Sequence, residues 1–574
     1  MTHTPTDQPT RRASGAVVPV LAFAGIVVAV MQTLLVPVIK DLPQLLDTAP
    51  ANATWVLTST LLSGAVATPI MGRLGDLYGK RRMLILSLAV MVVGALVSAL
   101  TSDLLTMIAG RTLQGFAMGA IPLGIGLMRD MLPREKLGSA MALMSSSIGV
   151  GGGLALPLAA LIAQHADWHA LFYGAAGIGA LAIVLTLLVV PESPARAEGT
   201  FDVLGAIGLS AGLVLFLLPI TKGSDWGWSS GTTLGLFAAS AVVLLLWGVM
   251  ELRVKAPLVD LRTTARPAVL FTNLASIMVG VSFYVVSLVL PQLLQLPKAT
   301  GYGLGQSMVV AGLLVAPLGL TMMVTAPVYA RLSAKYGPKF TLILGMLIIA
   351  IGYGAGLGLM SAAWQSLVIA VVLGAGIGLA YSSLPALIVG AVPASETGAA
   401  NGLNTLMRSI GTSVSSAVIG MVLANTANNV AVPTMHGFRV SFLIATGAVA
   451  VGLLMALFLP KPNRAPQLRA SSEEDAVIER ADEVLRGFRG RVLDAAGTPV
   501  PRAKVTLIDR RGRQAGATLS GDDGTYVLTV PSQGAYVLAA RATGHGPLAS
   551  SATHAGDDRA IDLDLALPGE TVTA

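Results

Sequence analysis

The chain has 574 residues, of which 54% are hydrophobic and only 12% are charged, and its mean hydropathy is +0.74. These values exclude an ordinary soluble protein and indicate a polytopic membrane protein. The net charge of +7 does not indicate a nucleic-acid partner, because the cations of the apolar part stand in short loops between apolar runs, and the absence of cysteine excludes disulfides and cysteine-ligated metals.

Fourteen apolar runs are long enough to cross a bilayer as helices, which takes about 20 residues each. The first follows Arg11 and Arg12 and is predicted to be a retained helix, because further spans follow it and no convincing cleavage site does. The runs lie near 16–39, 55–71, 83–101, 104–127, 140–162, 169–190, 203–220, 231–250, 269–294, 307–329, 340–360, 365–388, 402–424 and 439–459.

The cations of the loops predict the orientation of these helices. Loops on one side hold most of the Lys and Arg residues, whereas the other side holds only Lys40, Lys222 and Lys298. By the positive-inside rule the basic side faces the cytoplasm, so we expect a cell (inner) membrane protein with both termini, including the tail 1–15, in the cytoplasm.

An internal repeat indicates two related halves. The segment GRLGDLYGKR at 72–81 returns as ARLSAKYGPK at 330–339, so helices 2–3 match helices 10–11. The sequence therefore predicts an all-α membrane fold with six-helix halves at 16–190 and 269–460, and two inserted helices at 203–250.

The last part of the chain changes composition and is predicted to be soluble. Residues 461–487 read as a linker helix that begins near Ser471 to Glu474. From 488 to 574, short alternating segments separated by turns predict a small all-β sandwich. The segments GRVLDAAGTPVPRAKVTLID and GDDGTYVLTV resemble the carboxypeptidase regulatory-like fold, a module that has no catalytic residues of its own.

The loop Gly72-Arg73-Leu74-Gly75-Asp76-Leu77-Tyr78-Gly79-Lys80-Arg81-Arg82 resembles the signature loop of the major facilitator superfamily, and it lies between the second and third spans as it does in that family. Arg111-Thr112-Leu113-Gln114-Gly115 resembles the family's second motif. Fourteen helices resemble the family's drug:proton antiporter branch. The resemblance covers residues 16–460 and implies a secondary transporter that is not an enzyme.

The signature loop contains a candidate conformational latch. Gly72 and Gly79 permit a tight turn and close backbone approach, while Asp76 is an anion suited to a helix N-terminus, which the segment 398–402 offers. We expect Asp76, with Arg73 and Arg81, to hold the halves together when the cavity faces outward. The alternative is that the cations of this loop only anchor the topology.

Arg111 is a candidate cavity and coupling residue together with Gln114 and Gly115 of its motif. A cation inside a span is costly to bury, so we expect it to face the cavity. Gln32 and Thr33 of the first helix stand at a similar depth and are expected to contact Arg111 or the substrate, with plain helix packing as the alternative.

Glycines and a proline predict a bendable, closely packed fifth helix, the candidate hinge being Gly149, Gly151, Gly153 and Pro157. Antiporters of the superfamily carry a Gly-Pro motif here. This chain departs from it, because Gly152 stands where that proline is expected.

Proton coupling follows only from the family resemblance. Related fourteen-helix antiporters carry an acid in the first helix, but the segment 30–34 contains none, and no acid before residue 460 lies clearly at mid-membrane depth. Asp41, Asp47 and Asp103 near the outer face are possible proton carriers, with solvated loop carboxylates as the alternative.

Polar and aromatic residues among Met and Leu predict a cavity for amphipathic molecules. The candidate substrate contacts are Tyr284, Gln292, Tyr353, Tyr381 and Arg408, although ordinary packing, or for Arg408 a position at the membrane interface, is the alternative for each.

No metal site and no cofactor are predicted: His165 and His169 have i,i+4 spacing but no third ligand, and no phosphate-binding GxxxxGK[ST] loop is present. Energy is therefore expected from a gradient. The favoured function is proton-driven export of small hydrophobic or cationic molecules. The alternatives are transport of a metabolite or without proton coupling, and a receptor or scaffold that binds an unknown protein partner through its β-domain.

Overall fold

The structure is a computed structural model that describes residues 13–35, 38–39, 41–427, 432–460, 487–509, 514–530, 534–542, 545–554 and 560–568. The chain divides into two compact units, residues 1–462 and 463–574, and each is described by itself. The predicted linker helix at 461–487 lies outside the described residues, except for Gly487, which begins a strand.

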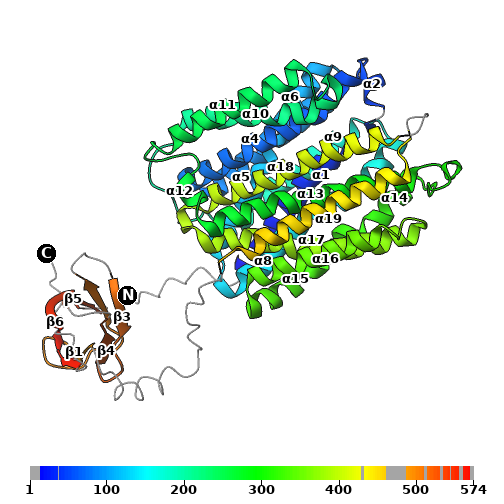
Figure 1. The fold of residues 1–574 in the computed structure, drawn as a ribbon. Coiled ribbons are helices and arrows are strands. Elements are labelled where there is room, and N and C mark those ends of the chain that lie inside the picture. The colour runs from blue at the N-terminus through cyan, green and yellow to red at the C-terminus, as the bar shows by residue number, and fades with distance from the viewer. Residues whose placement is uncertain are drawn as a thin grey trace, which may run out of the picture. The chain divides into compact units, whose positions relative to one another are not determined.

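The described part of the first unit contains fourteen helical segments that are long and apolar enough to cross a membrane, as predicted (Figure 1). Twelve are single helices: α1 (Ala13–Thr33), α4 (Trp55–Tyr78), α5 (Lys80–Ala99), α8 (Arg134–His165), α9 (Ala170–Val189), α10 (Val203–Trp226), α11 (Gly231–Glu251), α13 (Pro267–Gln295), α16 (Pro338–Gly356), α17 (Ala363–Ala391), α18 (Thr397–Asn425) and α19 (Met435–Leu457).

Two spans are interrupted. The fourth consists of α6 (Leu104–Gly115), the 3-10 turn η2 (Phe116–Gly119) and α7 (Ala120–Met131), and the tenth consists of α14 (Met308–Val315) and α15 (Pro317–Tyr336). In the tenth span the break falls at Pro317, which lacks the N–H that a continuous helix would need. The connections hold α2 (Leu42–Leu45), α3 (Pro50–Ala53), α12 (Leu261–Thr264), η3 (Lys298–Thr300) and η4 (Ala394–Glu396).

Each set of six spans has a hydrophobic core of its own. One cluster of buried side chains comes mainly from α1 and α4 to α9, and a second comes from α13 to α19. Glycines bring helices into equivalent close crossings in both sets: a Cβ at Gly94 would lie 2.5 Å from the Gly110 oxygen, and one at Gly345 would lie 2.7 Å from the Gly376 oxygen. Small residues at such crossings let backbones pack closely in a bilayer.

The inserted helices lie at one edge of the bundle, where α10 packs against α4 and α18 and α11 packs against α10 (Figure 1). Lys222 was predicted to lie in an outer loop, but α10 continues to Trp226 and includes it. Its side chain is buried because its ammonium group bonds to Thr54, pairs with Asp225 and lies 5.0 Å from the centre of the Trp55 ring.

The second unit is a β-sandwich, as predicted, with a core between two four-stranded sheets. One sheet has the order β4-β1-β7, with β8 also paired to β1, and the other has the order β3-β2-β5-β6. The strand β6, with the sequence LASSATH, has few large apolar residues. The strands are β1 (Gly487–Leu493), β2 (Lys504–Asp509), β3 (Gln514–Leu519), β4 (Thr525–Thr529), β5 (Gly534–Arg541), β6 (Leu548–His554), β7 (Ala560–Asp562) and β8 (Leu565–Ala566).

Candidate functional site

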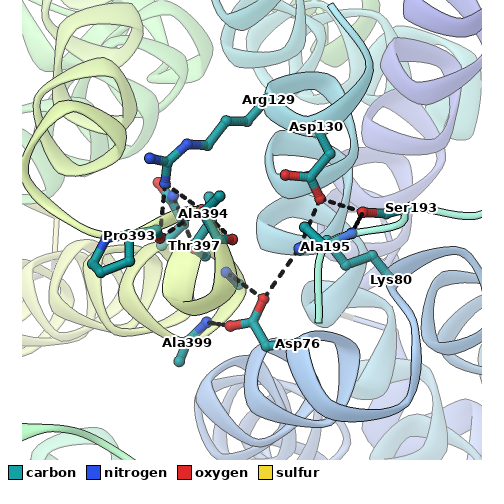
Figure 2. Close-up of polar contacts among 12 residues, drawn as sticks. Asp76, Lys80, Arg129, Asp130, Ser193, Ala195, Pro393, Ala394, Thr397 and Ala399 are labelled. Atoms are coloured by element: carbon teal, nitrogen blue, oxygen red, sulfur yellow. Dashed lines mark hydrogen bonds and ion pairs between the residues drawn. The ribbon is translucent and has the colours of Figure 1, made fainter. Parts of the chain in front are cut away.

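A carboxylate joins the two halves of the first unit near the signature loop. Asp76, close to the C-terminal end of α4, is fully buried, and its oxygens accept hydrogen bonds from the backbone N–H groups of Gly398 (3.0 Å) and Ala399 (2.8 Å) at the start of α18 (Figure 2). The first N–H groups of a helix have no partner within the helix and carry partial positive charge. An anion held there by two bonds connects α4 with α18.

Two glycines allow this approach. A Cβ built on Gly72 would lie 2.3 Å from the carbonyl oxygen of Gly398, and one built on Gly398 would lie 2.5 Å from that of Gly72. Either distance is far below van der Waals contact, so α4 and α18 meet backbone to backbone. We call Gly72, Asp76, Gly398 and Ala399 the α4/α18 junction.

Lys80 lies next to the α4/α18 junction, between the carboxylates of Asp76 and Asp130. Its Nζ is 3.5 Å from Asp76 and 2.8 Å from Asp130 at the end of α7, and the side chains of all three residues are almost completely buried. Ser193, in the connection after α9, donates its hydroxyl hydrogen to Asp130 (Figure 2). The three formal charges sum to one negative charge, which faces the partial positive charge of the α18 N-terminus.

Arg129 makes a second connection between the halves. From α7 its guanidinium donates to the carbonyl oxygens of Val392 (2.8 Å) and Pro393 (3.0 Å) and to the hydroxyl of Thr397 (Figure 2). The sequence assigned Arg129 and Lys80 only to topology. No sequence signal pointed to the contact of Lys80 with Asp76, because Lys80 begins α5 and does not share a helix with Asp76 of α4.

The remaining predicted latch residues lie on the N-terminal side of the junction. Gly79 separates α4 from α5 with a φ of +113°, a backbone conformation that favours glycine. Arg81 donates from its backbone N–H to Glu192 and from its guanidinium to the Leu187 oxygen, so its contacts stay within one half. Arg73 is buried, with no described hydrogen-bond or ion-pair partner, and lines a cavity.

Arg111 does not face an open cavity as expected. Its side chain is 1% exposed and donates to the carbonyl oxygens of Met31 (3.3 Å) and Val56 (3.4 Å) and to the Gln114 side chain (2.7 Å). Hydrogen bonds to a charged donor contribute about 1.5–3 kcal/mol each, so these three bonds offset part of the cost of burying the arginine. Arg111 therefore ties α1, α4 and α6 together.

Gln114 extends this network, while the first-helix residues stay outside it. The Gln114 amide donates to the Gly94 oxygen and to Ser98 of α5. A Cβ on Gly115 would lie 1.9 Å from Ser63 Oγ, so this glycine allows α4 to approach. Gln32 donates to the Met118 sulfur and Thr33 bonds to its own helix, so neither is bonded to Arg111.

The glycines of the fifth span are packing positions on two faces of a continuous α8. A Cβ at Gly149 would lie 2.4 Å from the Met322 sulfur of α15, and one at Gly151 would lie 2.7 Å from Ala29 of α1. Gly153 faces Ala316 at the break between α14 and α15. Pro157 lies inside α8 without ending it.

Most of the predicted substrate contacts are engaged in packing. Tyr353 is fully buried and donates to the Ser282 oxygen, so it does not line a cavity. The Arg408 guanidinium lies 4.7 Å from the centre of the buried Tyr381 ring, and Arg408 is itself buried, so its side chain packs inside the bundle. Tyr284 bonds to Ser416, and Gln292 is partly exposed near the far end of α13.

The acids of the spans stand near helix ends. Within the fourteen described spans the acids on α-helices are Asp76, Asp130, Asp225 and Glu251, each within three residues of a span's end, and Glu396 lies on η4 directly before α18. The exposed Asp103 caps α6, and its bonds from the N–H and hydroxyl of Thr106 hold the pKa of its carboxyl below the usual value.

The described residues contain no cluster of three or more potential metal-ligating His, Cys, Asp or Glu residues. His165 ends α8 and His169 precedes α9, so the two histidines do not share a helix as a paired metal site would require. His169 instead lies beside Asp167.

Comparison with known proteins identifies two families. The model of the Major Facilitator Superfamily matches residues 21–290 and 272–512, and that of the Carboxypeptidase regulatory-like domain matches 487–568. The chain is 27% identical over 426 residues to a tetracenomycin C resistance and export protein of Streptomyces glaucescens, covering 71% of this chain and 76% of that protein. It is 24% identical over 464 residues to Multidrug resistance protein 3 of Bacillus subtilis, covering 79% and 87%.

A solved structure supports the fold of the first unit. The proton:xylose symporter XylE bound to 6-bromo-6-deoxy-D-glucose superposes with a TM-score of 0.57 at 15% identity, over 78% of this chain and 96% of that one. At this identity the likeness concerns the fold alone.

Proposed function

The chain belongs to the major facilitator superfamily, and we propose that it exports small amphipathic or cationic molecules by alternating access, driven by protons. It is a multi-pass membrane transporter and not an enzyme. The names of two relatives, a tetracenomycin C resistance and export protein and a multidrug resistance protein, support export as the direction and organic molecules as the substrates.

The basic loops support a location in the cell (inner) membrane with both termini in the cytoplasm. Five cations stand at helix ends on the side of the bundle that carries the α4/α18 junction: Lys80, Arg81, Arg82, Arg129 and Arg134. With this end in the cytoplasm, the positive-inside rule is satisfied. The state described here then has its cytoplasmic end closed.

The observation that carries the proposal is Asp76 bonded to the first N–H groups of α18. The two halves have separate cores, so they can move as bodies once the contacts that join them break. In the proposed cycle the α4/α18 junction and Arg129 hold the cytoplasmic end closed while the substrate leaves outward. Release of both contacts opens the cavity to the cytoplasm.

Arg111 takes a positioning role in this cycle. Its bonds join α1, α4 and α6, so movement of α4 at the junction is transmitted to the first helix. Among the predicted substrate contacts, Gln292 is the partly exposed polar side chain that remains available to a bound molecule, and we retain it as a candidate contact.

A specific observation favours the second candidate, transport without proton coupling. The acids of the described spans stand at helix ends, and Asp103 is an exposed helix cap whose bonds from Thr106 hold the pKa of its carboxyl below the usual value. A proton carrier needs a carboxyl that changes protonation during the cycle. The drug:proton antiporter resemblance therefore supports coupling without identifying its acid.

The test is efflux of a cationic dye from vesicles, with and without an imposed pH gradient. Wild type is compared with Arg111→Lys, which keeps the charge but not the three-way hydrogen bonding, and with the exposed control Asp167→Asn. Gradient-dependent efflux that is reduced in Arg111→Lys supports the proposal. Efflux that does not depend on the pH gradient supports transport without proton coupling. If the inserted protein shows no dye efflux at all, the proposed export of small cationic molecules is contradicted.

A further inference from the structure

Near the α4/α18 junction lies a cavity that the transport cycle does not use. Its volume is 460 Å³, within the range of small-molecule sites. The walls come from α4, the connection after α9, the connection around α12, and the start of α18. The cavity is thus shared by both halves and by the segment that follows the inserted helices.

An unpaired cation opens into this cavity. Arg73 of α4 is 7% exposed, and its buried Nε has no hydrogen-bond partner. No described residue forms an ion pair or hydrogen bond with its guanidinium, although burying a charge without a partner costs several kcal/mol. Such a side chain is expected where a ligand supplies the missing negative charge.

Five other charged residues line the same cavity. Arg196 and Lys255 are exposed cations, and Glu198 is an exposed acid. The Asp260 carboxylate already has hydrogen-bond donors within its own segment: the backbone N–H groups of Arg262 and Thr263 and the hydroxyl of Thr263 at the start of α12. Glu396 is half-buried on η4.

We propose that this cavity binds a small phosphate ester, with the phosphate on Arg73 and with Arg196 and Lys255 as further cations. The planar guanidinium of arginine matches a phosphate with two parallel hydrogen bonds. The volume exceeds what a phosphate ion needs, and Leu258 and Leu403 offer apolar contacts for the organic part. The ester is either a free phosphorylated metabolite or the headgroup of a lipid.

A bound ester would favour the closed state described here. It would connect α4 with the segment after α11, beside Ala399, whose N–H bonds to Asp76. A ligand that binds one conformation shifts the population toward it. The ester is therefore expected to raise the melting temperature of the protein.

Titration calorimetry of the purified full-length protein in a phosphate-free buffer tests the proposal, with glycerol 3-phosphate and inorganic phosphate as probes. The ester is expected to bind more tightly than inorganic phosphate, and Arg73→Gln is expected to weaken its binding about tenfold or more. Lys255→Ala, an exposed change that should not affect folding, is expected to weaken binding severalfold. The matched control is Arg253→Ala in the same connection, outside the cavity.

A second arm uses nanodiscs of phosphatidylcholine with and without phosphatidic acid. A rise in melting temperature that requires phosphatidic acid and Arg73, without binding of the soluble ester, assigns the site to a lipid headgroup and supports the proposal. The proposal is overturned if glycerol 3-phosphate does not bind and phosphatidic acid does not raise the melting temperature, or if wild type, Arg73→Gln and Lys255→Ala respond equally. Because binding and melting are measured without transport, these outcomes are independent of dye efflux.

Discussion

Asp76 and Arg111 show how single charges are accommodated inside the bundle. Asp76 has the α18 N-terminus on one side and Lys80 on the other, whereas Arg111 has only neutral acceptors, two of them backbone oxygens. Hydrogen bonds to a charged group are stronger than neutral ones, so each residue joins several helices. Changes at these two residues should therefore have different effects.

Replacing Asp76 with Asn should destabilise the closed end. The amide keeps one acceptor but presents its NH₂ to the second N–H of α18, so at least one charge-assisted bond of about 1.5–3 kcal/mol is lost. We expect export to fall about tenfold at normal expression. Because the chain has no cysteine, Thr405→Cys, buried in α18, can report the opening by faster thiol labelling. Unchanged labelling and export would remove the latch.

Arg111→Ala should harm folding more than Arg111→Lys. Alanine leaves the Gln114 oxygen without its donor and a void between α1 and α4, and large-to-small changes in a core cost about 2–5 kcal/mol. Lysine keeps a charge and one or two of the bonds. Melting temperatures of the two purified variants should rank wild type, then Lys, then Ala. An alanine variant as stable as wild type would contradict the structural role of Arg111.

Asp76 was predictable as the partner of α18 because a signature loop, an acid and a glycine-rich helix start all stand in the sequence. Lys80 and Arg129 were not, because their partners Asp130 and Pro393 are distant in sequence and a loop cation is usually solvated. Arg111 was predictable as functional but not as buried, since its acceptors are carbonyl oxygens, which every residue has.

Among the helices, α8 shows how closely the halves are packed. Its glycines contact α1 on one face and α15 on the other, so one helix touches both six-helix sets. The sequence predicted this close packing from the glycine run. It did not predict the breaks of the fourth and tenth spans, because α6 to α7 and α14 to α15 read as continuous apolar segments.

Gly319→Ala should force α15 away from α8. The added Cβ would lie 2.0 Å from the carbonyl oxygen of Gly149. This oxygen belongs to the backbone of α8, so it cannot move away as a side chain could. We expect a lower melting temperature and slower transport. The control is Gly138→Ala on α8, where nothing lies within 4 Å and alanine favours the helix by about 1 kcal/mol. Equal effects of the two changes would mean that the crossing tolerates a methyl group.

In the molecule as a whole, transport and the β-sandwich belong to separate units. The strands of the second unit bury their own core, formed around Phe488, Val505, Tyr526 and Leu538. The fold of each unit was predictable, because helical runs and short alternating strands leave different patterns. The linker between them was predicted as a helix, and its residues lie outside the described ranges.

A fragment of residues 487–568 should fold alone and lose stability in acid. The Thr498 N–H bonded to Asp494, and the Thr525 hydroxyl bonded to Asp523, hold the pKa values of both carboxyls below the usual range. Their contribution is present above about pH 4 and is lost as the pH falls through the folded-state values. Urea unfolding at pH 7 and pH 3 measures it.

The double variant Asp494→Asn and Asp523→Asn is the control, because it removes the two titrating groups. Its stability should change less between the two pH values than that of the unchanged fragment. Equal acid sensitivity would place the effect at other groups, and a fragment that unfolds without cooperativity would show that it needs the rest of the chain.

The contact between Gly72 and Gly398 limits how the two halves can diverge in evolution. Each half has its own core, so substitutions in one core do not require changes in the other. Closure of the α4/α18 junction, however, requires a residue without a side chain at both of these positions. A substitution that adds a side chain at position 72 or 398 would require α4 and α18 to move apart. Among descendants of this chain, positions 72 and 398 are therefore expected to change together or not at all, although more than three hundred residues of sequence separate them.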